Sequence, residues 1–97
     1  MDYKDFRSSL KGTRPPRGLP ALLRALWHEA KGDWNRAHVI TAAERTTAAA
    51  RVHAYLHRKE GDSDNARYWY TRAGAERPHA SLRREWEALV RSFLDEE

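Results

Sequence analysis

Residues 53–74, HAYLHRKEGDSDNARYWYTRAG, decide the fold of this 97-residue chain. The stretch reads as two helices joined by a tight turn at Gly61 and Asp62. Gly tolerates the left-handed conformation that ends a helix, and Asp caps the helix that follows. Small and aromatic side chains then share one stripe of the second helix, at Ala66, Tyr70 and Ala73. The stretch therefore predicts an antiparallel pair of closely packed helices, a helical hairpin.

A weaker copy of this hairpin lies 29 residues upstream. A shift by 29 places Gly32-Asp33 on Gly61-Asp62 and Ala37 on Ala66. The same shift pairs Ile40 with Trp69, Thr41 with Tyr70, Ala25 with Ala54, and His28 with His57. A repeated hairpin cannot bury both of its faces alone, so such units stack. The sequence predicts an all-α fold in which two antiparallel hairpins stack side by side.

Helical patterns along the rest of the chain predict the bounds of the hairpin helices and a further helix at the C-terminal end. The expected helices of the hairpins cover about 19–31, 34–44, 47–60 and 62–73. A further helix begins at Pro78 or Ser81 and runs to about Leu94, with a strongly amphipathic spacing of Leu82, Trp86, Leu89, Val90 and Phe93. We expect this C-terminal helix to cap the stack.

The N-terminal segment differs in composition from the rest. Residues 1–18 form a basic segment and linker, and residues 19–97 form a single helical domain. The first 24 residues carry six Lys or Arg side chains against two Asp, so they hold the whole net charge of +4. We expect Phe6 and Leu10, which share a helical face, to pack the segment across the body. The alternative is a mobile arm that contacts nucleic acid or an acidic partner.

Composition narrows the class of protein. The chain has no Cys, which excludes disulfides and thiolate zinc sites and favours a reducing cytoplasm. It has no apolar run of membrane-spanning length and no signal-peptide pattern, so we expect a cytoplasmic protein without a membrane partner. Residues 25–97 are neutral overall, which disfavours nucleic-acid binding.

The pattern Gly61-Asp62-x-x-x-Ala66-x-x-x-Tyr70-x-x-Ala73-x-x-x-x-Pro78 resembles the second half of a tetratricopeptide repeat. That resemblance implies protein or peptide binding. The string HAYLHRxEGDxxNAxYWYxRAG is also similar to a group of small bacterial proteins of uncharacterised function. This second resemblance implies a bacterial cytoplasmic origin and implies no activity.

Histidines are the candidates for chemistry. His53 and His57 are four residues apart on one helical face, a spacing that can chelate a metal. His28, the repeat equivalent of His57, could supply a third ligand if the hairpins stack. The preferred reading is that these rings fill core positions and that the protein needs no metal or cofactor. A small metal-binding or catalytic protein centred on His28, His53 and His57 is the alternative.

The main functional expectation is a non-enzymatic interaction module. No phosphate loop, nucleophile motif or catalytic carboxylate pair is present in the sequence. Tyr68 cannot face inward together with Trp69 and Tyr70, so we expect its ring to point toward a neighbouring helix or a partner. The candidate binding residues are Tyr68, Trp34, His53, His57 and Arg58. The expected partner is a protein, a peptide or a second copy of the chain.

Overall fold

A computed structural model describes residues 1–95, and their regular secondary structure is entirely helical. The helices are α1 (Tyr3–Ser9), α2 (Ala21–Ala30), α3 (Trp34–Ala42), α4 (Thr47–Glu60), α5 (Ser63–Arg72) and α6 (Leu82–Asp95). The prediction of an all-α fold is confirmed for this part of the chain. None of the described helices has both the length and the apolar composition that crossing a bilayer requires.

The two Gly-Asp turns have the same local geometry. Gly32 and Gly61 adopt φ values of 90° and 89°, in the left-handed region that favours glycine. The amide of Asp33 donates to the His28 carbonyl and that of Asp62 to the His57 carbonyl, each at 2.9 Å. Both Asp side chains then accept from the amide three residues later and cap the next helix. The 29-residue repeat therefore describes the turns correctly.

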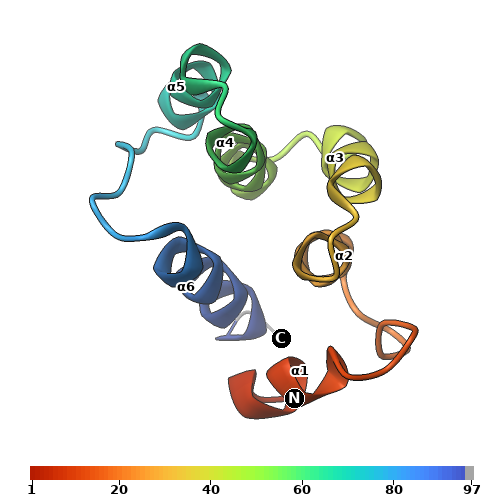
Figure 1. The fold of residues 1–97 in the computed structure, drawn as a ribbon. Coiled ribbons are helices and arrows are strands. Elements are labelled where there is room, and N and C mark those ends of the chain that lie inside the picture. Colours follow the sequence, from red (N-terminus) through yellow and green to blue (C-terminus); the bar gives the residue numbers. More distant parts are fainter. Residues whose placement is uncertain (96–97) are drawn as a thin grey trace.

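The helices pack as two pairs around a shared interior (Figure 1). α2 packs along α3, α4 packs along α5, and α3 contacts α4. We expected the last helix at one end of this arrangement. Instead, α6 packs against α2 and α4, the first helix of each pair, and also contacts α1. The reason is that the apolar stripe of α6 completes a core to which both pairs contribute.

The N-terminal segment is part of this core. Phe6 is completely buried, and its ring lies 5.9 Å from that of Trp86 in α6, measured between centroids. Leu10 is partly buried against the same cluster. The expected packing through Phe6 and Leu10 is confirmed, and it explains why α1 lies beneath α6 in Figure 1.

Three tryptophans link neighbouring helices by hydrogen bonds from their indole N–H groups. Trp27 donates to Ser9 Oγ at 3.1 Å, Trp34 to the Leu56 carbonyl at 2.8 Å, and Trp86 to the Leu26 carbonyl at 3.1 Å. Each ring thus buries apolar area while its polar atom remains satisfied. The bonds join α2 to α1, α3 to α4, and α6 to α2.

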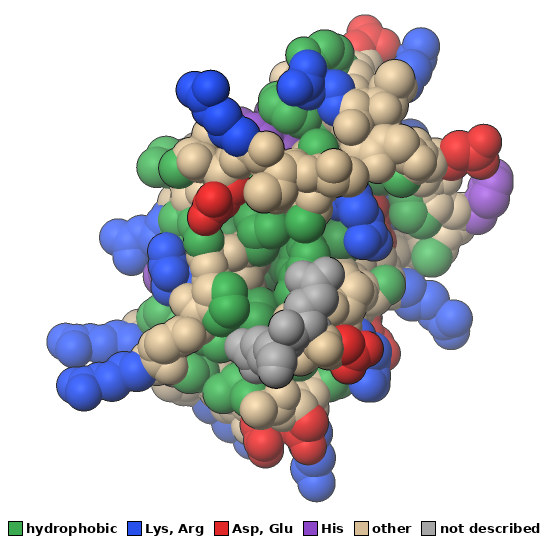
Figure 2. All heavy atoms as spheres, turned by 180° about the vertical axis from the view of Figure 1, so that it is seen from behind, with side chains coloured by type: hydrophobic (Ala, Val, Ile, Leu, Met, Phe, Trp, Pro, Cys, Tyr) green, Lys and Arg blue, Asp and Glu red, His purple; other side chains and the backbone are tan. Residues whose placement is uncertain are grey.

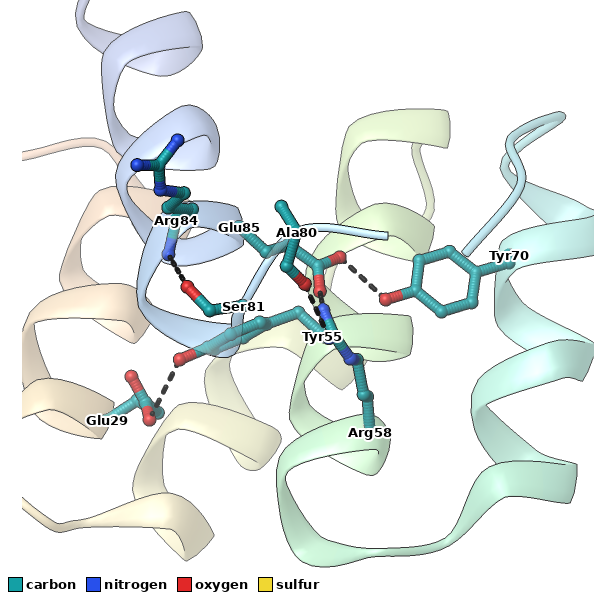
Figure 3. Close-up of polar contacts among 8 residues, drawn as sticks. All are labelled: Glu29, Tyr55, Arg58, Tyr70, Ala80, Ser81, Arg84 and Glu85. Carbon is teal, nitrogen blue, oxygen red and sulfur yellow. Dashed lines mark hydrogen bonds and ion pairs between the residues drawn. The ribbon is translucent and has the colours of Figure 1, made fainter. Parts of the chain in front are cut away.

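A buried carboxylate joins three helices (Figure 3). Glu85 of α6 accepts from Arg58 of α4 at 2.7 Å and from the Tyr70 hydroxyl of α5 at 2.6 Å. Arg58 also donates to the Ala80 carbonyl at 2.7 Å. Arg58, a candidate binding residue in the sequence, is therefore engaged inside the fold, with its side chain only 11% exposed.

One face of the molecule carries interspersed charges. On the face shown in Figure 2, Lys and Arg side chains project around the outline, and Asp and Glu side chains lie between them. Hydrophobic side chains are visible toward the middle of that face. No basic stripe of the kind that tracks a nucleic-acid backbone runs across this view.

The Glu85 contacts predict a large effect of substitution. Glu85→Ala would leave the Arg58 guanidinium buried without its counter-ion, which costs about 3–5 kcal/mol of unfolding free energy. Urea unfolding followed by circular dichroism measures this change. Glu87→Ala on the same helix removes an exposed ion pair with Arg91 and should leave stability nearly unchanged. Equal midpoints for the two variants would contradict this account of the Glu85 contacts.

Candidate functional site

Three histidines meet where α3 packs against α4, next to α5. His38 comes from α3, and His53 and His57 come from α4. One ring nitrogen of each lies within 4.8 Å of the other two. His53 and His57 are each only 6% exposed, and His38 is half-buried. We call His38, His53 and His57 the histidine cluster.

Helical spacing and hydrogen bonds orient the rings of this cluster. His53 and His57 are one turn apart, and their rings are nearly parallel at 5.5 Å between centroids. The Nε2 atoms of His38 and His53 are 3.0 Å apart, so one ring donates its N–H to the other. His57 Nδ1 donates to Glu60 Oε1 at 2.7 Å. In a neutral His57 ring with this contact, Nε2 is the nitrogen that carries the lone pair.

Two tryptophan rings stack on either side of the histidine cluster. Trp34 stacks on His38 with 4.9 Å between ring centroids and an angle of 9°. Trp69 of α5 stacks on His53 at 4.0 Å and 6°. Because Trp34 is anchored to the Leu56 carbonyl, its ring fixes the orientation of His38. The tryptophans also exclude water from most of the cluster.

Burial and mutual repulsion keep two imidazoles of the cluster, those of His38 and His53, uncharged. Burial is the largest of the causes that lower the pKa of His53 to about 4, and the neighbouring His38 and His57 add to it. Burial and the neighbouring His57 also lower the pKa of His38. Near neutral pH both rings are therefore neutral, the form in which a ring nitrogen can accept a hydrogen bond or bind a metal ion.

The arrangement has the chemical features of a metal centre. Imidazole nitrogens bound to one tetrahedral Zn²⁺ lie about 3.3 Å apart, since each Zn–N bond is about 2.0–2.1 Å. The His38–His53 separation is already close to this value. Glu60 holds the far nitrogen of His57 in the manner of the carboxylates that orient metal-bound histidines. Glu60 and Asp62 also form a second group of potential ligands with His57.

The structure brings together two of the three histidines that the alternative reading of the sequence placed in one site. His53 and His57 lie together, whereas His28 lies edge-on against Trp27, with ring centroids 5.2 Å apart. His28 belongs to no group of potential ligands in the described chain; His38 occupies the third position. Sequence reasoning missed His38 because it followed the repeat. The available signal was its spacing of four residues from Trp34, on a different stripe from Ala37 and Thr41.

The remaining candidate residues have separate environments. Trp34 is half-buried and belongs to the wall of the histidine cluster. Tyr68 is 54% exposed, and the Arg72 guanidinium lies 5.7 Å from its ring centroid. Only Tyr68 among the candidate binding residues thus presents a largely exposed side chain.

Comparisons with protein family models, with curated proteins and with solved structures found no match to this chain. Its function must therefore be inferred from the chemistry of its side chains.

The lowered pKa of His53 predicts a pH-dependent stability of the metal-free protein. The unfolded chain takes up a proton near the ordinary pKa of 6.5, whereas folded His53 resists protonation until about pH 4. The unfolding free energy contributed by His53 should therefore fall by on the order of 2–3 kcal/mol as the pH drops from 7 to 4.

Urea unfolding at several pH values, with a chelator present, measures this dependence. His53→Leu should show a smaller loss of stability on acidification than the original chain. His79→Ala, which changes an exposed histidine, should retain the original pH dependence. An unchanged dependence in His53→Leu would refute the assignment.

Proposed function

We propose that this protein binds one divalent transition-metal ion, such as Zn²⁺, through His38, His53 and His57. The observation that carries the proposal is the convergence of three ring nitrogens within 4.8 Å of one another in a largely buried site. Three imidazoles suit Zn²⁺, Cu²⁺ or Ni²⁺, and the absence of Cys disfavours softer ions such as Cu⁺.

Binding requires little rearrangement of the rings. The hydrogen bond between the Nε2 atoms of His38 and His53 would be replaced by two metal–nitrogen bonds. Each ring would then carry its proton on Nδ1, while Glu60 continues to accept from His57 Nδ1. The lowered pKa values of His38 and His53 favour binding, because no proton has to be displaced from a charged ring near pH 7.

The location of the ion suggests what binding does for the protein. His38 belongs to the first helical pair, and His53 and His57 belong to the second. An ion held by all three would cross-link α3 to α4. Since the ion binds only the folded arrangement, it would stabilise the fold by about 2.7 kcal/mol at a concentration 100 times its dissociation constant.

Titration of the full chain with Zn²⁺, followed by calorimetry and thermal melting, tests the proposal. We expect one equivalent of Zn²⁺ to bind and to raise the melting temperature. His38→Ala, His53→Ala and His57→Ala should each abolish the rise, and Glu60→Gln should weaken binding about 10- to 100-fold. Bound Co²⁺ should give the intense visible absorption of a tetrahedral ion.

Two other histidines provide matched controls. His28→Ala and His79→Ala should bind Zn²⁺ like the original chain, because neither belongs to the histidine cluster. His28→Ala also separates the two versions of the site. If His28→Ala lost Zn²⁺ binding and His38→Ala kept it, the ligands would be His28, His53 and His57, the set inferred from the sequence. The set that includes His38 would then be wrong.

An interaction module is the second candidate function, and the exposed ring of Tyr68 favours it. The pairing of α4 with α5, and its resemblance to a tetratricopeptide repeat, supports binding of a protein segment or a second copy of the chain. Because α6 and α1 cover the inner helices, such a partner would have to use the outer surface. Tyr68 on α5, with Arg72 beside its ring, offers an aromatic contact there.

Self-association through Tyr68 can be measured by light scattering over a range of concentrations. A concentration-dependent increase in mass that Tyr68→Ala removes would support the module. We expect Val39→Ala, which changes another exposed apolar side chain, to have no effect. A strict monomer that also captures no protein partner would eliminate this second candidate.

A further inference from the structure

A cavity of about 410 Å³ adjoins the histidine cluster. It lies between the connection from α3 to α4 and the last turn of α5, and His53 and Trp69 form part of its wall. The volume falls within the range of small-molecule sites, roughly 300–1,000 Å³. The cavity is thus large enough for a small organic molecule that contacts the histidine cluster.

The charged groups of this cavity favour an anion. Arg45 and Arg72 line it, against the single carboxylate of Glu44. Arg72 is held in place by two rings, since its guanidinium lies 5.6 Å from the Trp69 centroid and 5.7 Å from that of Tyr68. A guanidinium presents a planar fork of donors that matches the two oxygens of a carboxylate or phosphate.

The histidine cluster supplies the second half of the site. Three protein ligands leave one position of a tetrahedral metal ion open to another ligand. His53 belongs both to the cluster and to the cavity wall, so an ion bound there would lie next to the cavity. The charge of the ion would add to that of the two arginines. The face of Trp69 and the methyl group of Ala50 offer apolar contacts to the rest of the molecule.

We propose that this cavity binds a small organic oxyanion, a carboxylate or a phosphate ester, with one oxygen on the metal ion and another on Arg45 or Arg72. The proposal rests on the metal site proposed above. It assigns a class of ligand to the cavity: an anion with a compact apolar part that packs on Trp69.

Co²⁺-loaded full-length protein allows a direct test with benzoate and phenyl phosphate as probes. An oxygen that enters the coordination sphere changes the visible absorption of the ion, so titration reports binding at the metal. We expect at least one probe to produce a saturable change. At least one of the variants Arg45→Ala and Arg72→Ala should weaken its binding about tenfold, as expected for loss of a charge-assisted hydrogen bond.

Two further variants distinguish loss of the anion site from damage to the fold. Arg67→Ala removes an exposed arginine from the same helix as Arg72 and should bind the probe normally. Glu44→Gln removes the carboxylate of the cavity and should strengthen binding about threefold, a gain that damage to the fold cannot produce.

The outcomes separate the two proposals. Failure of Co²⁺ and Zn²⁺ to bind the histidine cluster would overturn both. Normal metal binding with a spectrum that neither probe alters would overturn the anion site and leave the metal site standing. Probe binding that is equally strong in Arg45→Ala, Arg72→Ala and Arg67→Ala would also overturn the anion site.

Discussion

The buried carboxylate of Glu85 holds three helices in one arrangement. It accepts from Arg58 of α4 and from Tyr70 of α5, and it lies on α6, which reaches this place only after the long connection from 73 to 81. An ionised carboxylate is costly to bury unless its oxygens find strong donors, and here two donors come from two other helices. Displacement of any of these helices would leave a charge or a hydroxyl without its partner. The network therefore disfavours alternative packings of α6 that hydrophobic contacts alone would tolerate.

The position of α6 has a consequence for function. It fills the space beside α2 and α4, together with α1, so these inner helices contribute to the core and are not left free as a binding surface. A second junction forms where α3 and α5 flank α4. The histidine cluster and its adjoining cavity both lie at this junction. The candidate site is thus built by α3, α4 and α5 with the connection between α3 and α4, and α6 contributes no residue to it.

α3 uses one stripe of residues to pack against α2 and the adjacent stripe to pack against α4. Ala37 and Thr41 of α3 are buried, as the close packing of α2 against α3 requires. Trp34 and His38 lie on the adjacent stripe, where they meet Leu56, His53 and His57 of α4. Burial among these rings lowers the pKa values of His38 and His53. The neutral imidazoles suited to a metal ion are therefore a product of the contact between the two helical pairs.

Much of the local structure follows from the sequence alone. The Gly-Asp pairs at 32–33 and 61–62 determine where helices end and begin, because a left-handed glycine and a capping carboxylate act within a few residues. The period of the apolar residues likewise indicates α6, and the spacing of Phe6 and Leu10 indicates a segment that packs. The adjacency of His53 and His57 also follows, since one helical turn separates them.

Tertiary structure decided the rest. The repeat pointed to His28 as the partner of His57, but equivalent positions in two hairpins need not meet, and the packing of α3 on α4 brings in His38 instead. Glu29 and Glu85 are acidic, and acidic side chains usually lie in solvent. Both are nevertheless buried here against hydrogen-bond donors from other helices. These contacts join residues 15 to 27 positions apart. The spacing of residues along one helix cannot specify them, because they depend on the angle and register at which separate helices pack.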